Sequence, residues 1–270
     1  MNTKGKLKLA LGTATDYVAP HFVENHTNTA PTGWRLNVIK AVLFSRLQHT
    51  IRAHDTSATQ DAHFSFWNNI TTADYFDKAT NRFGLWFLGA HKPIVDKIHQ
   101  LHHALPFKRI VEIGCGDGQV LNYFAQNLDG LDELIGIDIN AAVLEQNRQK
   151  YADIEKIKFI AGNAEDHYDL VSQDNTLVFV YGGVLEYFSQ DAVQTLFRQM
   201  LAHKNSVIAF VEPIADDHNL AQQPRSYIFG PDDSFSHNHA WLAKQVGLSV
   251  LFNEQTRTDD IRWVMCICAN

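Results

Sequence analysis

A glycine-rich stretch flanked by carboxylates is the first place in the sequence where residue types and spacing suggest chemistry. The stretch reads VEIGCGDGQV and places Gly114, Gly116 and Gly118 directly after an apolar run. Glycines in such a turn let a ligand approach the backbone closely, as at the nucleotide sites of open α/β sheets. Glu112 and Asp117, however, would repel a phosphate. The stretch therefore indicates a ligand that carries positive charge and no phosphate.

Two common phosphate-binding patterns do not match this stretch. The dinucleotide fingerprint G-x-G-x-x-G requires its third glycine where this sequence has Gln119. A phosphate-binding loop requires a Lys followed by Ser or Thr, and the stretch contains neither pair. An NAD-dependent oxidoreductase is therefore disfavoured.

The segment Glu112-x-Gly114-x-Gly116-x-Gly118 resembles the first motif of the class I S-adenosylmethionine (SAM)-dependent methyltransferases. The resemblance implies that SAM is the cofactor, that the glycine loop wraps its methionine part and that Glu112 holds its ammonium group. Asp138 ends the run ELIGID and resembles the family's acidic residue that accepts hydrogen bonds from the ribose hydroxyls. A carboxylate with two acceptor oxygens suits such a diol.

Two further segments extend the resemblance. AGNAED resembles the family's adenine-binding turn, which implies that Asn163 and the backbone of Ala164 meet the adenine edge. The family more often has Asp at the position of Asn163, and Asp166 is a second candidate for this role. The segment YGGVLEY resembles the family's segment beneath the sulfonium, which implies that Tyr181 contacts the cofactor. The resemblance covers residues 108–270.

Seven short β-rich runs alternate with helix-like segments from residue 108 onward. Most of the runs are nearly continuously apolar, as expected of strands that helices cover on both faces. The order predicts an α/β fold with a doubly wound, mostly parallel seven-stranded sheet of the class I methyltransferase type and an N-terminal helical cap. The predicted strands are 109–113, 133–138, 157–161, 176–181, 206–212, 248–253 and 261–269, and the predicted helices of this half are 118–127, 141–151, 189–203 and 238–246.

The first part of the chain differs in pattern, so we divide the chain into a tail and cap at 1–105 and a SAM-binding core at 106–270. Residues 1–32 show little periodicity and predict a loop or partly ordered tail. Residues 35–52 have apolar residues near helical spacing among basic ones, which predicts an amphipathic helix. Such a helix can lie on a membrane surface, but we favour packing on its own protein.

Methyl transfer to oxygen needs a base, and methyl transfer to nitrogen needs a neutral amine. Such groups are expected at the carboxyl ends of the strands, where open α/β sheets bind ligands. We assign catalysis to Glu186 and His237, although a helix start and a helix cap also explain them. The aromatic-rich segment 64–88 and the ends of the fourth and fifth strands supply the residues assigned to the substrate: Trp67, Tyr75, Tyr187 and Glu212.

The net charge, the N-terminal sequence and the cysteines limit the classes of partner and the compartment that we expect. The chain has 270 residues and a net charge of -7, so no general basic field favours nucleic acid. The N-terminus does not read as a signal peptide, and the three cysteines have no paired spacing, which together indicate a cytoplasmic protein. We assign no metal site, and we expect no membrane partner. The sequence leaves a homo-oligomer open.

These patterns predict a SAM-dependent methyltransferase that modifies an oxygen or nitrogen atom of a small-molecule acceptor, such as a sugar or another metabolite. Two alternatives stay open. The acceptor could be a protein side chain, or the chain could be a SAM-binding module without turnover.

Overall fold

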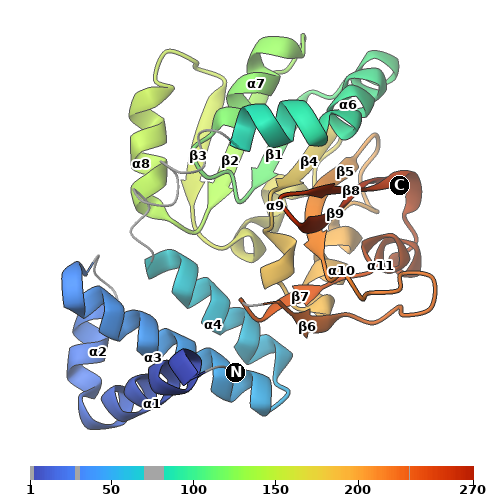
Figure 1. Cartoon of the computed structure of the whole chain (residues 1–270). Coiled ribbons are helices and arrows are strands. Elements are labelled where there is room, and N and C mark those ends of the chain that lie inside the picture. Colours follow the sequence, from blue (N-terminus) through green and yellow to red (C-terminus); the bar gives the residue numbers. More distant parts are fainter. Residues whose placement is uncertain (1–2, 28–30, 70–81, 231) are drawn as a thin grey trace. The chain divides into compact units, whose positions relative to one another are not determined.

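The chain forms two compact units, Met1–Tyr75 and Phe76–Asn270. The structure, a computed structural model, describes residues 3–27, 31–69, 82–230 and 232–270 (Figure 1). Each unit buries its own set of apolar side chains. Throughout these described ranges, no helix combines the length and the apolar character that crossing a bilayer requires.

The smaller unit consists of helices. They are α1 (Thr3–Val18), α2 (Pro20–Thr27), α3 (Gly33–Arg52) and α4 (Thr56–Asn69). The helix predicted at 35–52 is confirmed as α3. The loop or tail predicted for residues 1–32 is wrong, because α1 and α2 occupy most of this segment.

Packing against α3 explains why α1 forms despite its weak periodicity. A Cβ atom at Gly12 would lie 2.0 Å from the carbonyl oxygen of Ala41, so the two helices approach closely at this glycine. The Asp16 carboxylate accepts two hydrogen bonds from the Arg46 guanidinium, at 2.7 and 2.9 Å. Tertiary contacts of this kind commonly stabilise helices whose own propensity is marginal.

A seven-stranded sheet organises the larger unit, as predicted. The strand order is β3-β2-β1-β4-β5-β9-β8, in which β9 runs antiparallel to both of its neighbours and the other six strands run in one direction. Val111 of the central strand pairs with Ile135 on one side and Val178 on the other. The strands of this sheet are β1 (Arg109–Ile113), β2 (Glu133–Asp138), β3 (Ile157–Ala161), β4 (Thr176–Tyr181), β5 (Val207–Ile214), β8 (Ser249–Thr258) and β9 (Ile261–Ala269).

Helices cover both faces of the sheet (Figure 1). The elements are the π-helix η1 (Phe83–Ala90), α6 (Lys92–Ala104), α7 (Gln119–Asn127), α8 (Ala141–Lys150), η2 (Ala164–His167), α9 (Tyr168–Val171), η3 (Leu185–Tyr187), α10 (Gln190–Gln199) and α11 (His239–Val246). The four helices predicted between the strands are present as α7, α8, α10 and α11. A hairpin of β6 (Tyr227–Phe229) and β7 (Ser234–Ser236), which we did not predict, lies between β5 and α11 in the sequence.

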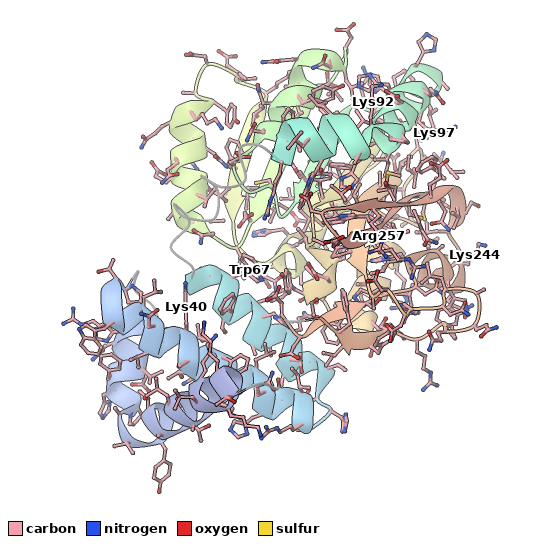
Figure 2. The ribbon with its side chains drawn as sticks, in the orientation of Figure 1. Lys40, Trp67, Lys92, Lys97, Lys244 and Arg257 are labelled. Atoms are coloured by element: carbon pink, nitrogen blue, oxygen red, sulfur yellow. The ribbon has the colours of Figure 1, made fainter. Side chains whose placement is uncertain are left out.

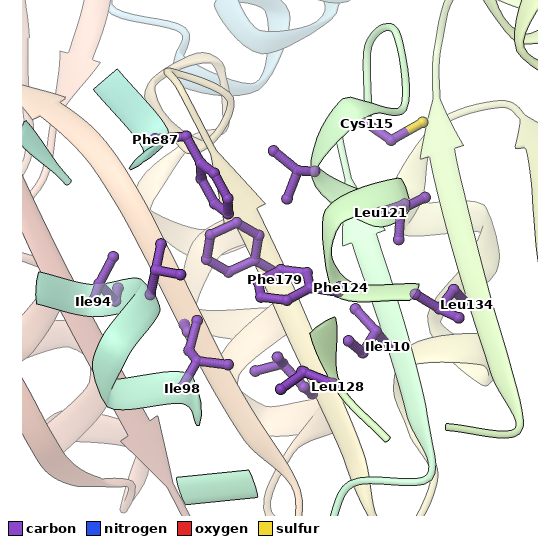
Figure 3. Close-up of a cluster of buried hydrophobic side chains, with 14 of the residues drawn as sticks. Phe87, Ile94, Ile98, Ile110, Cys115, Leu121, Phe124, Leu128, Leu134 and Phe179 are labelled. Carbon is purple, nitrogen blue, oxygen red and sulfur yellow. The ribbon is translucent and has the colours of Figure 1, made fainter. Parts of the chain in front are cut away.

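The core of the larger unit lies between the sheet and the helices before and after β1. Phe87 of η1, Ile98 of α6 and Phe124 of α7 pack with Phe179 of β4 in one buried cluster (Figure 3). On the other face, the ring of Phe210 in β5 stacks on a phenylalanine of α10. The contacts therefore place Phe83–Ala104, which we predicted to belong to the cap, in the larger unit.

Candidate active site

The glycine loop joins β1 to α7 and has a backbone that only glycine adopts readily. Gly114, Gly116 and Gly118 all have positive φ angles, of 71°, 48° and 73°. A Cβ atom at Gly114 would lie 2.4 Å from a methyl group of Val184, so the loop contacts the segment that follows β4. The loop therefore requires glycine both for its turn and for this close approach.

Side chains from α8 and β2 hold the loop in this conformation. The Asp138 carboxylate accepts a hydrogen bond from the Gly116 amide at 2.9 Å. The Asn147 side chain donates to the Gly116 carbonyl at 2.6 Å, and the Tyr151 hydroxyl donates to the Asp117 carbonyl at 3.0 Å. Sequence reasoning missed Asn147 and Tyr151, because nothing in a helix pattern shows that a side chain bonds to a distant loop.

The carboxylates at the loop form a site that suits a cation. Glu112 is buried, and its Oε2 atom has no hydrogen-bond partner within the described part of the chain. Burial, and then the nearby charges of Asp117 and Asp138, raise the pKa of Glu112 well above its usual range. Burial also raises the pKa of Asp138, while the amides of Asn140 and Gly116 oppose this shift. A positive ligand group would stabilise these carboxylates, whereas a phosphate would add to their repulsion.

The turn after β3 lies beside Asp138, because the Gly162 amide donates to the Asp138 carbonyl at 3.0 Å. Asn163 begins the short helix η2, where its side-chain oxygen accepts from the Glu165 amide at 3.1 Å. Ala164 is buried behind it. The structure therefore brings Asn163 and Ala164 to the same edge of the sheet as the glycine loop.

Two buried side chains, Glu212 and His237, form hydrogen bonds with the backbone of the segment 182–188, which follows β4. The Glu212 carboxylate accepts hydrogen bonds from the amides of Val184 and Glu186, at 3.0 and 3.2 Å. The Nε2 atom of His237 lies 3.0 Å from the Leu185 carbonyl and 3.1 Å from the Phe188 carbonyl, so it carries the proton and donates to both. Both side chains are completely buried.

These contacts change the roles that we predicted for Glu212 and His237. The second ring nitrogen of His237 lies 2.6 Å from the Ser226 hydroxyl, so both nitrogens already have partners. Burial lowers the pKa of His237 to about 4, so the ring stays neutral near pH 7. In this structure neither side chain has a surface for an acceptor, and both position the 182–188 segment instead.

Glu186 differs from these two residues because its pKa lies near neutral pH. The Ser234 hydroxyl of β7 donates to its Oε2 atom at 2.6 Å. Burial raises the pKa of Glu186 to about 7, although the Ser234 hydrogen bond opposes the shift. A carboxyl group with such a pKa can accept a proton near neutral pH.

A tyrosine–histidine pair lies at the end of β4. The Tyr181 hydroxyl is 3.0 Å from Nδ1 of His91, which is completely buried at the start of α6. Burial lowers the pKa of His91 to about 4 and raises that of Tyr181, so both groups stay neutral. The rings of Phe87 and Trp263 pack against this pair. Sequence reasoning missed His91, because its partner lies 90 residues further along the chain.

The other residues predicted for the substrate fall in different parts of the chain. Tyr187 ends η3, directly after Glu186. Trp67 projects from α4 of the smaller unit (Figure 2). Tyr75 lies outside the described residues.

Comparisons with known proteins agree with this geometry. Residues 110–205 match a family model described as a methyltransferase domain. The ubiquinone/menaquinone biosynthesis C-methyltransferase UbiE of Legionella pneumophila (strain Lens) is 23% identical over 210 residues, which cover 68% of this chain and 82% of that protein.

Solved structures share the fold. A SAM-dependent methyltransferase of Clostridium acetobutylicum aligns with a TM-score of 0.51 and 10% identity, over 72% of this chain and 98% of that one. A SAM-dependent methyltransferase of Leishmania major aligns with a TM-score of 0.50 and 14% identity, over 92% of this chain and 82% of that one. The chain therefore contains a methyltransferase domain, and its larger unit has the fold of the SAM-dependent methyltransferases.

Proposed function

We propose that this enzyme transfers the methyl group of SAM to an oxygen or nitrogen atom of a small-molecule acceptor, with Glu186 as the group that accepts the proton. The observation that carries the proposal is the place of Glu186 in η3, at the carboxyl edge of the sheet, where Ser234 donates to it and burial raises its pKa to about 7. Its segment contacts the glycine loop through Val184 and Gly114. A base in this place can act on an acceptor that lies against the cofactor.

The cofactor would be held by the residues that resemble the family motifs. The buried, unpartnered oxygen of Glu112 suits the ammonium group, and the backbone of the glycine loop suits the methionine chain. Asp138 has a free lone pair on each oxygen for the ribose hydroxyls, because each oxygen accepts one amide hydrogen bond from the protein. Asn163 and Ala164 would meet the adenine. When bound, SAM supplies an electrophilic methyl group.

The acceptor would contact groups beside Glu186 and Tyr181. Tyr187 is adjacent in sequence to the base, and Tyr181 presents a hydroxyl that His91 orients. The assignment of Trp67 and Tyr75 to the acceptor stays a prediction from the sequence. Small polar metabolites, including sugars, fit a base of this kind because a hydroxyl nucleophile must lose its proton during transfer.

The similarity to the Legionella C-methyltransferase favours a second candidate acceptor. That protein is a C-methyltransferase, so this acceptor atom is a carbon. Loss of a proton from the acceptor would increase the electron density on the carbon, so Glu186 would have the same role. The two candidates differ only in the atom that receives the methyl group.

Two experiments test the proposal in order. Calorimetric titration should show that SAM and its demethylated product bind, that NAD does not bind, and that Asp138→Ala loses the binding. Labelled SAM should then transfer its methyl group to small molecules of a cell extract, and mass spectrometry of the products identifies the methylated atom. Transfer only to protein would support a protein-directed enzyme. Binding without any transfer would support a module without turnover.

A further inference from the structure

An exposed apolar face runs along helix α1 of the smaller unit. Four of its large apolar side chains are exposed, with exposed fractions of 72% for Leu7, 47% for Leu11, 88% for Tyr17 and 77% for Val18. Together with Ala10 and Ala14 they recur at spacings of three and four residues, which places them on one side of the helix. This α1 apolar face consists of Leu7, Ala10, Leu11, Ala14, Tyr17 and Val18, all of which are exposed.

Contacts on the opposite side of α1 fix the direction in which this face points. Gly12 is buried against Ala41 of α3, and the Thr13 hydroxyl lies 2.7 Å from the Ser45 hydroxyl. Asp16, the single acidic residue of α1, pairs with Arg46 of α3. The α1 apolar face therefore lies away from α3.

Two lysines border the α1 apolar face. A helix advances about 100° per residue, which places Lys4 at one edge of the face and Lys6 at the other. Both side chains are exposed. Since Asp16 is turned towards Arg46, the exposed side of α1 combines apolar groups with positive charge and has no carboxylate.

The charge of the whole smaller unit has the same sign. Residues 1–75 contain seven lysines and arginines and five acidic residues, whereas residues 76–270 contain 16 and 25. The negative net charge of the chain therefore comes from the larger unit. A basic helical segment on an acidic enzyme suits a negatively charged partner surface.

We propose that the α1 apolar face docks on an anionic lipid surface, although the sequence alone led us to expect no membrane partner. Apolar side chains flanked by lysines match the pattern of a helix that lies in the interface of a membrane, where the chains enter the headgroup region and the lysines meet lipid phosphates. The amphipathic helix that the sequence marks, α3, is not available for this contact, because Ile39, Val42, Leu43 and Leu47 are buried. The inference is independent of the acceptor.

Vesicle co-sedimentation of the full chain tests the proposal. Vesicles of phosphatidylglycerol and phosphatidylcholine in equal parts should sediment the protein, and vesicles of phosphatidylcholine alone should sediment much less. Lys4→Gln with Lys6→Gln should weaken the binding roughly 30-fold, because each lysine near an anionic surface contributes about fivefold. Leu7→Gln with Leu11→Gln should weaken it at least about tenfold, since less apolar area enters the interface.

A matched control replaces exposed apolar residues elsewhere. Leu251 and Ile261 are 44% and 37% exposed on the larger unit, so Leu251→Gln with Ile261→Gln should sediment like the unmodified chain. Circular dichroism and SAM affinity should be unchanged in all three double variants. Equal sedimentation with both vesicle types, or leucine variants that bind as before, would refute the proposal. A dimer that dissociates in the leucine variant without any vesicle binding would assign the face to a second copy of the chain instead.

Discussion

Replacement of Glu186 by Gln gives the sharpest test of the proposed base. Burial raises the pKa of this carboxyl group from 4.5 to about 7. At 1.36 kcal/mol per pH unit, ionisation of Glu186 in the folded protein costs about 3 kcal/mol. The protonated carboxyl group therefore contributes about 3 kcal/mol to the free energy of unfolding, relative to the ionised group. Because the pKa is raised, this contribution is fully present below about pH 4.5 and is lost as the pH rises through about 7.

Gln cannot ionise, and its side-chain oxygen can still accept the hydrogen bond from Ser234. Glu186→Gln should therefore be more stable than the unmodified protein above pH 7, by up to about 3 kcal/mol. The difference should shrink as the pH approaches 4.5. Urea unfolding at several pH values measures it, and Glu155→Gln, at an exposed position, should show no such pH dependence.

Activity should change in the opposite direction. If Glu186 accepts the proton, kcat should fall about 100-fold or more in the Gln variant, and the rise of kcat/KM around pH 7 should disappear. A variant that is stabilised above pH 7 but keeps its kcat and its pH profile would remove Glu186 from catalysis. Equal stability at every pH would contradict the burial argument itself.

Three further substitutions test other parts of the structure. Gly114→Ala should lower SAM affinity at least about tenfold in calorimetry, because the positive φ is strained for Ala and its Cβ would strike Val184; unchanged affinity would contradict the loop geometry. A bound cation lowers the raised pKa of Glu112, so SAM binding to the unmodified protein should release protons, which calorimetric titrations in two buffers detect. Glu112→Gln should weaken SAM binding and abolish this proton release. Equal release in both proteins would reject this role. Gly12→Ala should destabilise the smaller unit by about 1–3 kcal/mol, seen as earlier proteolysis of residues 3–69, since its Cβ would overlap the carbonyl of Ala41; resistance like that of the unmodified chain would refute the close crossing.

The strands of the larger unit could be predicted because the residues of each strand indicate it without reference to distant parts of the chain. Runs such as 109–113 and 176–181 are mostly apolar, and a glycine follows each of them. The sheet confirms all seven strands. Helix α1 could not be predicted in this way, because its formation depends on Gly12 meeting a backbone oxygen of α3, a contact that periodicity does not encode.

The candidate site shows the same division. The sequence indicates that Glu186, Glu212 and His237 follow strands or precede a helix, but it does not show which of them is enclosed. That outcome depends on which backbone amides and carbonyls fold against each side chain. Glu212 and His237 each contact two backbone groups of the 182–188 segment, whereas Glu186 bonds to a hydroxyl of a hairpin that the sequence does not reveal.

The β6–β7 hairpin also sets an order for the assembly of the protein during synthesis. The glycine loop, Asp138 and Asn147 lie within a stretch of chain that emerges early, and their mutual contacts span at most 31 residues. Glu186 can bond to Ser234 only after 48 further residues have been synthesised. The Leu185 carbonyl can accept from His237 only after 52 further residues. A ribosome-bound chain that stops before the hairpin would therefore contain every predicted cofactor residue while the proposed base still lacks its hydroxyl partner.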